Sequence, residues 1–351
     1  MMRFLLDDEQ REFARSLDGM LTAADTPGAA RAWAAGDTAP GRALWARLAE
    51  AGVFALAVPE RHEGLGPMPL ELAVACAELG RHAVPGPLVE TVAAAAFLDR
   101  LDEVDRLDGL DEVDRLDGLD GFGHAGAAAE WLPRIAGGKA LLSLCVPAAS
   151  GPYALDPDAA DAVLVVDGDT VRLAETTGPL QPSADPVRRL ARPLGGTVLA
   201  RGPAVAAAAS HAAEVAALAT AAQSLGLGRA LLDRTVAYVG QRTQFGAAVG
   251  SFQAVKHRLA DTLIALEFAQ PLLYSAALAL AEGADHASAE IAAAKVTAGE
   301  AAYAAARTAL QLHGAVGYTD ELDLALWIRK ARPLRDAWGT PAACRARVLA
   351  R

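Results

Sequence analysis

Three long stretches in the C-terminal half of the chain constrain its fold more than any other feature. They cover residues 204–242, 251–282 and 286–312, are rich in Ala and Leu, and are broken only around QRTQFGAAVG, GADHAS and HGAVGYTDE. Helices of this length that are apolar on more than one face usually pack in a bundle, often across a subunit interface. The pattern therefore predicts a C-terminal helical bundle over residues 204–351.

The rest of the chain divides into two further domains. Residues 1–137 read as a helical block, because apolar residues recur at spacings of three and four in the segments 7–21, 41–51, 70–79 and 87–98. Residues 138–203 contain short strand-like runs, LLSLCV, DAVLVVDGDTVRLAE and GTVLAR, separated by Pro, Gly and Asp. We therefore predict an α+β protein, mainly α, with an N-terminal helical domain, a small middle β domain and a C-terminal four-helix bundle.

One internal repeat lies in the first domain, where LDEVDRLDG occurs at residues 101–109 and again at 110–118. A nine-residue unit is two and a half helical turns, so the second copy would face the opposite side of a continuous helix. Gly109 weakens such a helix further. We interpret residues 101–121 as a solvated insertion; a metal-binding role for its acids is the alternative, although they lack the Gly and the spacing of an EF-hand loop.

Composition excludes several classes of protein. With 53% hydrophobic and 21% charged residues the chain can bury a large core, and a net charge of -11 disfavours nucleic acid as a partner. The acids of MMRFLLDDEQREF do not suit a secretion signal, and no stretch reads as a membrane-spanning helix, so a cytoplasmic location without membrane attachment is expected. Cys76, Cys145 and Cys344 are isolated and form neither a disulfide framework nor a metal-site pattern, so no metal is predicted.

Two segments carry residues suited to a nucleotide: RTQFGAAVGSFQAVKHRLAD at 242–261 and QLHGAVGYTDELDLALWIRKAR at 311–332. Arg242 and Gln244 offer donors for a pyrophosphate, and Phe245 offers an apolar plate for a base. Gly314 lets a ligand approach the backbone closely. Taken alone, the Arg-Gln-Phe-Gly turn also fits a plain helix end closed by glycine.

Together these segments resemble the acyl-CoA dehydrogenase family. The stretches LWARLAEAGVFALAVPERHEGLG and WLPRIAGGKALLSL extend the resemblance over nearly the whole chain except the repeat. It implies an N-terminal helical domain, a β-barrel-like middle domain, a C-terminal four-helix domain and a tetramer built on the latter.

The resemblance also implies FAD as cofactor. In the family, the Arg-x-Gln-Phe-Gly turn, the Phe-Gln pair that follows and the Gln-x-x-Gly-Gly turn hold the ADP half of an FAD whose flavin lies mainly in the neighbouring subunit. The residues carried over on this basis are Arg242, Gln244, Phe245, Phe252, Gln253, Gln311, Gly314, Ala315 in place of the second glycine, and Thr340.

The family's reaction requires a glutamate base that removes the α-proton of an acyl-CoA while the β-hydride passes to the flavin. The family places this base at one of two positions. In the Tyr-Glu-Gly-Thr turn this chain has Trp338, whose indole has no basic lone pair, and on the first long C-terminal helix it has Ala216 and Ala217. A shifted loop with another base is the alternative, and its candidates are Glu321, Asp336, Glu214 and Asp320.

The middle domain also departs from the family. Family members hold the flavin of their own subunit with a Thr-Glu-Pro...Gly-Ser-Asp stretch and a Trp-x-Thr/Ser-Asn stretch. This chain runs from CVPAASGPYA to AADAVLVVDGD, where only Pro147 and Ser150 match the first stretch and nothing matches the second. The comparison implies a reduced middle domain that lacks the flavin-binding face.

These features predict a small, non-catalytic subunit of an α2β2 acyl-CoA dehydrogenase, resembling the enzymes that actinobacteria use on bulky steroid-CoA thioesters. Its expected partners are a full-length catalytic subunit, an acyl-CoA substrate, and electron-transfer flavoprotein or a similar acceptor. Two alternatives stay open: a homomeric acyl-CoA dehydrogenase with a relocated base, and a helical scaffold or CoA-binding protein without redox activity.

Overall fold

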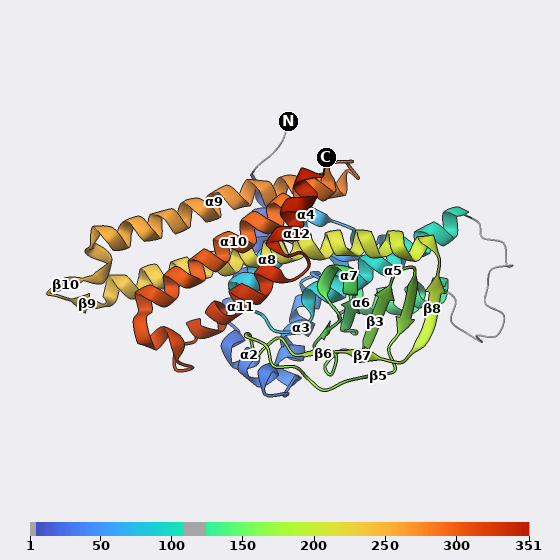
Figure 1. The fold of residues 1–351 in the computed structure, drawn as a ribbon, viewed down its shortest axis with the longest axis horizontal. Coiled ribbons are helices and arrows are strands. Elements are labelled where there is room, and N and C mark those ends of the chain that lie inside the picture. Colours follow the sequence, from blue (N-terminus) through green and yellow to red (C-terminus); the bar gives the residue numbers. More distant parts are fainter. Residues whose placement is uncertain (1–4, 109–123, 351) are drawn as a thin grey trace. The chain divides into compact units, whose positions relative to one another are not determined.

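The chain is mainly helical, with a small set of strands between two helical regions (Figure 1). The computed structural model describes residues 5–108 and 124–350. The elements in chain order are α1 (Asp8–Thr22), α2 (Thr26–Ala34), α3 (Ala39–Glu50), η1 (Ala55–Ala57), η2 (Glu60–His62), α4 (Pro69–Arg81), α5 (Leu88–Asp108), α6 (His124–Ala136), β1 (Leu142–Cys145), α7 (Pro147–Ser150), β2 (Ala154–Leu155), β3 (Ala162–Asp167), β4 (Thr170–Leu173), β5 (Thr176–Thr177), β6 (Leu190–Ala191), β7 (Pro193–Leu194), β8 (Thr197–Arg201), α8 (Pro203–Gln241), β9 (Thr243–Gln244), β10 (Ala247–Ala248), η4 (Val249–Ser251), α9 (Gln253–Ala281), α10 (Ala287–His313), η5 (Gly314–Tyr318), α11 (Leu324–Asp336) and α12 (Pro341–Leu349).

The chain forms two compact units, each built from separate segments. Unit 1 comprises Met1–Arg31, Ala73–Val84 and Ala217–Arg351, and unit 2 comprises Ala32–Leu72 and Pro85–Ala216. The boundary between them falls within the long helix α8, so part of that helix belongs to each unit.

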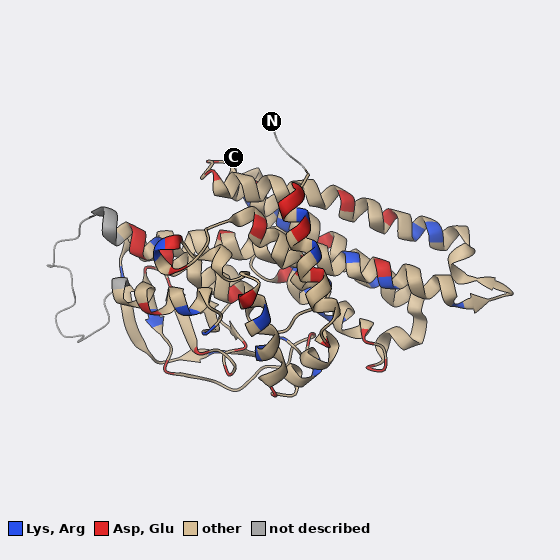
Figure 2. Ribbon diagram, turned by 180° about the vertical axis from the view of Figure 1, so that it is seen from behind, with Lys and Arg blue, Asp and Glu red and all other residues tan. Residues whose placement is uncertain are grey.

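The core of unit 1 is the predicted helical bundle, in which α10 packs against α9, α11 and α12. The two longest of these helices, α9 and α10, carry few charged residues for their length (Figure 2). Many of the residues that α10 buries are alanines, among them Ala298, Ala302 and Ala309, whose small side chains let neighbouring helices approach closely. A Cβ on Gly228 of α8 would lie 2.6 Å from Leu266 Cδ2 of α9, so any side chain there would force the leucine to move.

Helices α4 and α8 approach each other closely at a pair of glycines. A Cβ on Gly80 of α4 would lie 2.1 Å from the carbonyl oxygen of Gln223, and a Cβ on Gly226 of α8 would lie 1.7 Å from that of Ala77. Any side chain at either position would force the helices apart. The two glycines therefore fix where α4 crosses α8.

Unit 2 contains a four-stranded sheet in the order β1-β3-β4-β8. Strands β1 and β3 are parallel, with Leu142 opposite Ala162, and the remaining pairs are antiparallel. Thr91 of α5 fixes β1, because its hydroxyl donates to the carbonyl oxygen of Leu142 at 2.8 Å and accepts from the Leu142 N–H at 3.0 Å. Short pairs β2–β6 and β5–β7 complete the strands described in unit 2, and β9 pairs with β10 in unit 1.

The periodic segments predicted at 7–21, 41–51 and 70–79 are confirmed as α1, α3 and α4, with ends that differ by one or two residues. The segment predicted at 87–98 continues as α5 to Asp108 and thus takes in most of the first repeat copy. Leu101 and Asp102 of that copy are buried, so its beginning packs in unit 2 and is not a solvated segment. The second copy lies outside the described residues.

The expectation that no stretch reads as a membrane-spanning helix is wrong by the criteria of length and composition. Both α8 and α9 are long and apolar enough, because their Ala- and Leu-rich sequences carry few charges. In their most apolar windows, 61% of the residues of α8 and 39% of those of α9 are buried within the protein. Much of the apolar surface of α8 is therefore already covered by other helices, whereas α9 leaves more of its surface exposed.

Candidate cofactor and active site

The turn that follows α8 presents the first group of predicted cofactor residues. Gln244 lies in β9, and Phe245 and Gly246 form the tip of the β9–β10 hairpin with φ angles of 54° and 75°. Phe245 is 96% exposed, which is far from the usual environment of a phenylalanine. Phe252 precedes α9 and is 39% exposed, and Gln253 begins that helix on the surface. The hairpin lies at one end of the bundle (Figure 1) and exposes one aromatic ring, and Phe252 exposes a second at the start of α9.

Arg242 connects this hairpin to the end of α10. Its Nη1 donates to the carbonyl oxygen of His313 at 3.4 Å and to the hydroxyl of Tyr238, and its guanidinium lies 5.6 Å from the centre of the Tyr238 ring. The Tyr238 ring in turn stacks on the His313 ring with 4.1 Å between centroids. These contacts hold a positively charged side chain at the surface beside the start of η5.

The end of α10 supplies the second group of predicted residues. Gln311 accepts a hydrogen bond from Arg258 of α9, which joins the two helices at this end of the bundle. Gly314 has a φ of 68°, and no atom lies within 4 Å of the place where a Cβ would stand. Gly314 and Ala315 are both exposed, so their backbone is open to a ligand. The structure therefore brings Arg242, Gln311 and Gly314 to the same end of the bundle as the hairpin.

Thr340 does not join this group. It is the N-cap of α12, and its hydroxyl oxygen accepts from the backbone N–H of Ala343 at 3.3 Å. Figure 1 places α12 well away from the β9–β10 hairpin. The Thr340 side chain therefore caps α12 in this chain.

Trp338 occupies a buried turn between α11 and α12. It is 4% exposed and has a φ of 51°, a left-handed conformation that a bulky residue rarely adopts. The next residue, Gly339, has a φ of 130°, and its carbonyl oxygen accepts from Lys295 Nζ at 3.3 Å. A hydrogen bond from Lys295 of α10 thus holds the turn at Trp338 and Gly339.

The second family base position lies inside α8. Ala216 is 0% exposed and Ala217 is 2% exposed. A methyl side chain can neither accept a proton nor donate a hydrogen bond to a thioester. Neither family position therefore carries a group that can act as a base.

Of the alternative bases, Glu321 and the nearby Asp320 lie beyond η5. Glu321 is exposed and lines a cavity of about 340 Å³ together with Arg234, Tyr238, His313 and Asp323. Asp320 forms an ion pair with Arg329 at 2.6 Å and its side chain is 79% exposed. Both carboxylates are thus in contact with solvent.

The remaining candidates have local partners. Asp336 accepts from the Nε of the adjacent Arg335 at 3.1 Å, and Glu214 lies on α8 near His211. Burial lowers the pKa of His211, and the negative charge of Glu214 opposes that shift. In the middle domain, Ser150 bonds to the backbone N–H and carbonyl of Val146 within α7. Ser150 therefore closes its own turn.

The cavity beside Glu321 was not predicted from the sequence. Arg234 lies over the ring of Trp327 at 4.0 Å, and burial lowers the pKa of the arginine. Burial also lowers the pKa of His313, whose Nδ1 lies 2.8 Å from the carbonyl oxygen of Ala309. A signal was available for two of its residues, because Tyr238 precedes Arg242 by one helical turn and His313 directly precedes Gly314.

Comparison with known proteins gives a consistent result. The model described as "Acyl-CoA dehydrogenase, N-terminal domain" matches residues 7–100, and that described as "Acyl-CoA dehydrogenase, C-terminal domain" matches residues 206–351. Acyl-CoA dehydrogenase IpdE2 of Mycobacterium tuberculosis (strain ATCC 25618 / H37Rv) is 33% identical over 341 residues, which cover 92% of this chain and 91% of that protein. The protein of the same name from Mycolicibacterium smegmatis (strain ATCC 700084 / mc(2)155) is 30% identical and covers 95% and 96%.

Solved structures agree on the fold. The glutaryl-coenzyme A dehydrogenase glutaryl-CoA complex has a TM-score of 0.79 at 20% identity and covers 99% of this chain and 96% of that one. The ChsE4-ChsE5 complex from Mycobacterium tuberculosis has a TM-score of 0.78 at 23% identity and covers 99% and 98%. The predicted fold class is thereby confirmed, and the chain belongs to the acyl-CoA dehydrogenase family.

Proposed function

We propose that this chain is the non-catalytic subunit of a heteromeric, FAD-dependent acyl-CoA dehydrogenase, in which it supplies the ADP half of the FAD site to a catalytic partner. The observation that carries the proposal is Trp338, an indole buried at the position of the family's base. Ala216 and Ala217 occupy the other base position. A chain with these three residues has no proton acceptor where the family's reaction needs one.

The residues at the end of the bundle fit the ADP half of FAD. The guanidinium of Arg242 is exposed and held by Tyr238 and the carbonyl of His313, which suits a charge-assisted contact with a pyrophosphate. The open space at Gly314 lets a phosphate reach the backbone N–H groups that follow. The exposed ring of Phe245 offers a face on which an adenine can stack. The cost of exposing such a ring is removed when a ligand or a partner covers it.

The reaction itself is the α,β-dehydrogenation of an acyl-CoA thioester. FAD, when bound, accepts the β-hydride. This chain's own residues orient the ADP end and exclude water from it, and the partner supplies the base and the surface around the flavin. Electron-transfer flavoprotein or a similar carrier is the proposed acceptor.

An exposed apolar face on α9 supports assembly with a partner. Ile264, Phe268 and Leu272 repeat every four residues and are 51%, 71% and 40% exposed, and Leu263 beside them is 45% exposed. A contiguous apolar stripe of this kind marks an interaction surface on a soluble protein. Among the similar structures, ChsE4-ChsE5 is described as a complex of two named chains.

A longer relative supports the same interpretation. Acyl-CoA dehydrogenase FadE34 of Mycobacterium tuberculosis is 30% identical, and the match covers 83% of this chain but 39% of that protein. A segment like this chain therefore accompanies a larger remainder within one polypeptide there. In this chain, we propose that a separate partner subunit takes the place of that remainder.

A steroid side-chain CoA thioester is the proposed substrate class. The similar structure that supports it is described as the Tcur3481-Tcur3483 steroid ACAD G363A variant, with a TM-score of 0.77 at 23% identity.

A homomeric acyl-CoA dehydrogenase with a relocated base, which would be Glu321, Asp336 or Glu214, is the second candidate function. The cavity beside Glu321 is the observation that favours it. A helical scaffold without redox activity is the third.

Expression of the chain with and without a partner tests the proposal. We expect the lone chain to purify colourless and inactive, because it holds only half of each cofactor site. Co-expressed with an acyl-CoA dehydrogenase subunit that has an intact glutamate base, it should form an α2β2 complex with one FAD for each chain of this type. The ratio of flavin to protein absorbance on a sized complex measures this. A yellow, active homotetramer would contradict it, and absence of flavin under both conditions would favour the scaffold.

The Glu321→Gln variant separates the first two candidate functions. We expect the turnover number of the assembled complex to fall by less than about 10-fold, because an exposed carboxylate beside Arg234 and Asp323 serves the shape of the cavity and not proton transfer. Steady-state kinetics with a CoA thioester measures the effect, and Glu300→Gln on the surface of α10 is the matched control. Loss of several orders of magnitude with flavin still bound would identify Glu321 as the base.

A further inference from the structure

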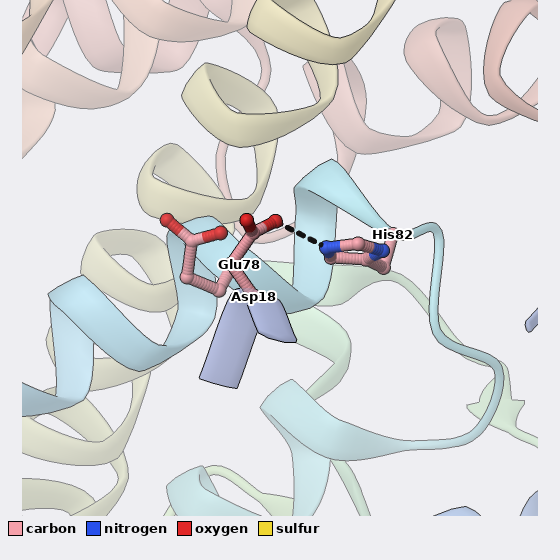
Figure 3. Close-up of side chains that lie close together, drawn as sticks. All are labelled: Asp18, Glu78 and His82. Carbon is pink, nitrogen blue, oxygen red and sulfur yellow. Dashed lines mark hydrogen bonds and ion pairs between the residues drawn. The ribbon is translucent and has the colours of Figure 1, made fainter. Parts of the chain in front are cut away.

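We propose that Asp18, Glu78 and His82 form a Zn²⁺-binding site in unit 1, remote in sequence from the cofactor residues. Glu78 lies in the last turn of α4, and Asp18 comes from α1 (Figure 3). His82 follows the end of α4, and its backbone N–H donates to the carbonyl oxygen of Glu78 at 3.1 Å. One potential ligand atom from each residue lies within 4.8 Å of the other two. The site would join the first helix of the chain to α4.

The first observation for a ligand is the state of Glu78. Its Oε2 is buried and has no hydrogen-bond partner. A buried carboxylate oxygen without a donor is costly, and a cation beside it would compensate that cost.

The neighbouring arginines do not fill this role, because their donors point to other acids. The Nη2 of Arg81 donates to Asp233 at 2.9 Å, and its Nε lies 3.5 Å from Asp18. The Nη2 of Arg229 donates to Glu267 at 2.8 Å. Both guanidinium groups thus form ion pairs that involve α8 and do not donate to Glu78 Oε2. A bound cation could supply the positive charge that this oxygen lacks.

The second observation is the geometry of His82. Its side chain is 11% exposed, and its Nε2 lies 2.8 Å from Asp18 Oδ1. Because this nitrogen faces one of the two acids, a cation bound between Asp18 and Glu78 would also lie within reach of the imidazole.

The donor set favours zinc over the common alkaline-earth cations. One imidazole nitrogen and two carboxylate oxygens suit Zn²⁺, whereas Mg²⁺ and Ca²⁺ prefer oxygen ligands alone. Metal–ligand distances of about 2.1 Å place neighbouring donors roughly 3.4 Å apart in a tetrahedral site, so a small side-chain movement closes the present spacing. The Asp18 side chain is 46% exposed, which leaves it free to move and gives the ion a route from solvent. Water would take the fourth position.

Zinc uptake by the full chain tests the proposal. The chelator-treated protein is dialysed against ZnCl₂, and bound metal is measured by mass spectrometry. We expect about one zinc per chain, and an absorption band of tetrahedral strength when Co²⁺ replaces Zn²⁺. A roughly 100-fold excess of Zn²⁺ over Kd should raise the Tm by about 5 °C.

Two variants of the proposed ligands and one control variant test whether zinc binds at this site. Glu78→Gln and Asp18→Asn should each weaken zinc binding by at least roughly 10-fold, and the second, at a half-exposed position, keeps the test valid if the first does not fold. His286→Asn is the control, because His286 also pairs with a glutamate one turn away, Glu290 at 3.5 Å, but on the surface of the protein. Equal uptake by the wild-type chain and both variants, no uptake by the wild type, or equally tight binding of Mg²⁺ would each overturn the proposal.

Discussion

Replacing Lys295 with methionine is expected to lower the free energy of unfolding by about 3 kcal/mol, since three hydrogen bonds of roughly 1 kcal/mol each are lost. Lys295 is 1% exposed, and its Nζ donates to the carbonyl oxygens of Leu334 at 3.1 Å, Arg335 at 2.9 Å and Gly339 at 3.3 Å. Two of these carbonyls end α11, where the helix dipole favours a positive charge. Methionine keeps the length of the side chain but leaves the three acceptors without this donor.

Urea unfolding of the full chain, followed by tryptophan fluorescence, measures this effect. Lys256→Met is the matched control, because Lys256 is exposed in the first turn of α9 and its loss should change the free energy of unfolding by less than about 0.5 kcal/mol. The turn at Trp338 should also loosen in the Lys295 variant, since Gly339 loses its contact. Equal urea midpoints for Lys295→Met and Lys256→Met would contradict the prediction. They would show that water satisfies the three carbonyl oxygens with no loss of stability.

Arg242→Ala is expected to weaken FAD binding in the assembled complex by roughly 10- to 100-fold, which corresponds to about 1.5–3 kcal/mol for a charge-assisted hydrogen bond. The fold should persist, because Arg242 is exposed and its partners Tyr238 and His313 still stack on each other. Titration of the flavin-free complex with FAD, followed by flavin fluorescence, gives the dissociation constant.

Arg15→Ala is the control for this experiment. Arg15 is also an exposed arginine of unit 1, paired with Glu12 on α1, and its removal lowers the net charge by the same amount. A general electrostatic effect would weaken FAD binding equally in both variants. An unchanged dissociation constant in Arg242→Ala would remove this arginine from the proposed site.

The helices and strands of this chain were largely predictable from its sequence, because their signals are local. The spacing of apolar residues located α8, α9 and α10 to within about two residues, and alternation located β3 and β4. The extension of α5 was not predicted. Its last turns carry a charged repeat that reads as solvated, whereas tertiary contacts bury Leu101 and Asp102.

The candidate cofactor residues were predictable in part. Arg242, Gln244 and Phe245 belong to one turn, so their proximity follows from the sequence, and their role in binding FAD stays a prediction. The contact between Arg258 and Gln311 joins two helices and could not be predicted from local patterns. Lys295 gave no signal either, because a single lysine in an Ala-rich helix reads as a solvated residue.

The absence of a metal site from the sequence predictions has the same cause. The cysteines give no such signal, and all three are buried and free. Asp18 lies far from Glu78 in the sequence, and only the packing of α1 beside α4 brings them together. Spacing rules cannot detect ligands that different helices supply.

The division of unit 1 into three chain segments determines when it can form during synthesis. Its first segment, Met1–Arg31, and its last, Ala217–Arg351, are separated by the whole of unit 2 and by the short segment Ala73–Val84. At a translation rate of roughly 5–20 residues per second, α1 leaves the ribosome some tens of seconds before the last helices of its own unit. During that interval Leu17 and Leu21, which are 1% and 0% exposed in the folded chain, have no completed core to enter. Unit 2 is therefore expected to fold first, and chaperones that shield apolar segments should bind the nascent chain at its first helix.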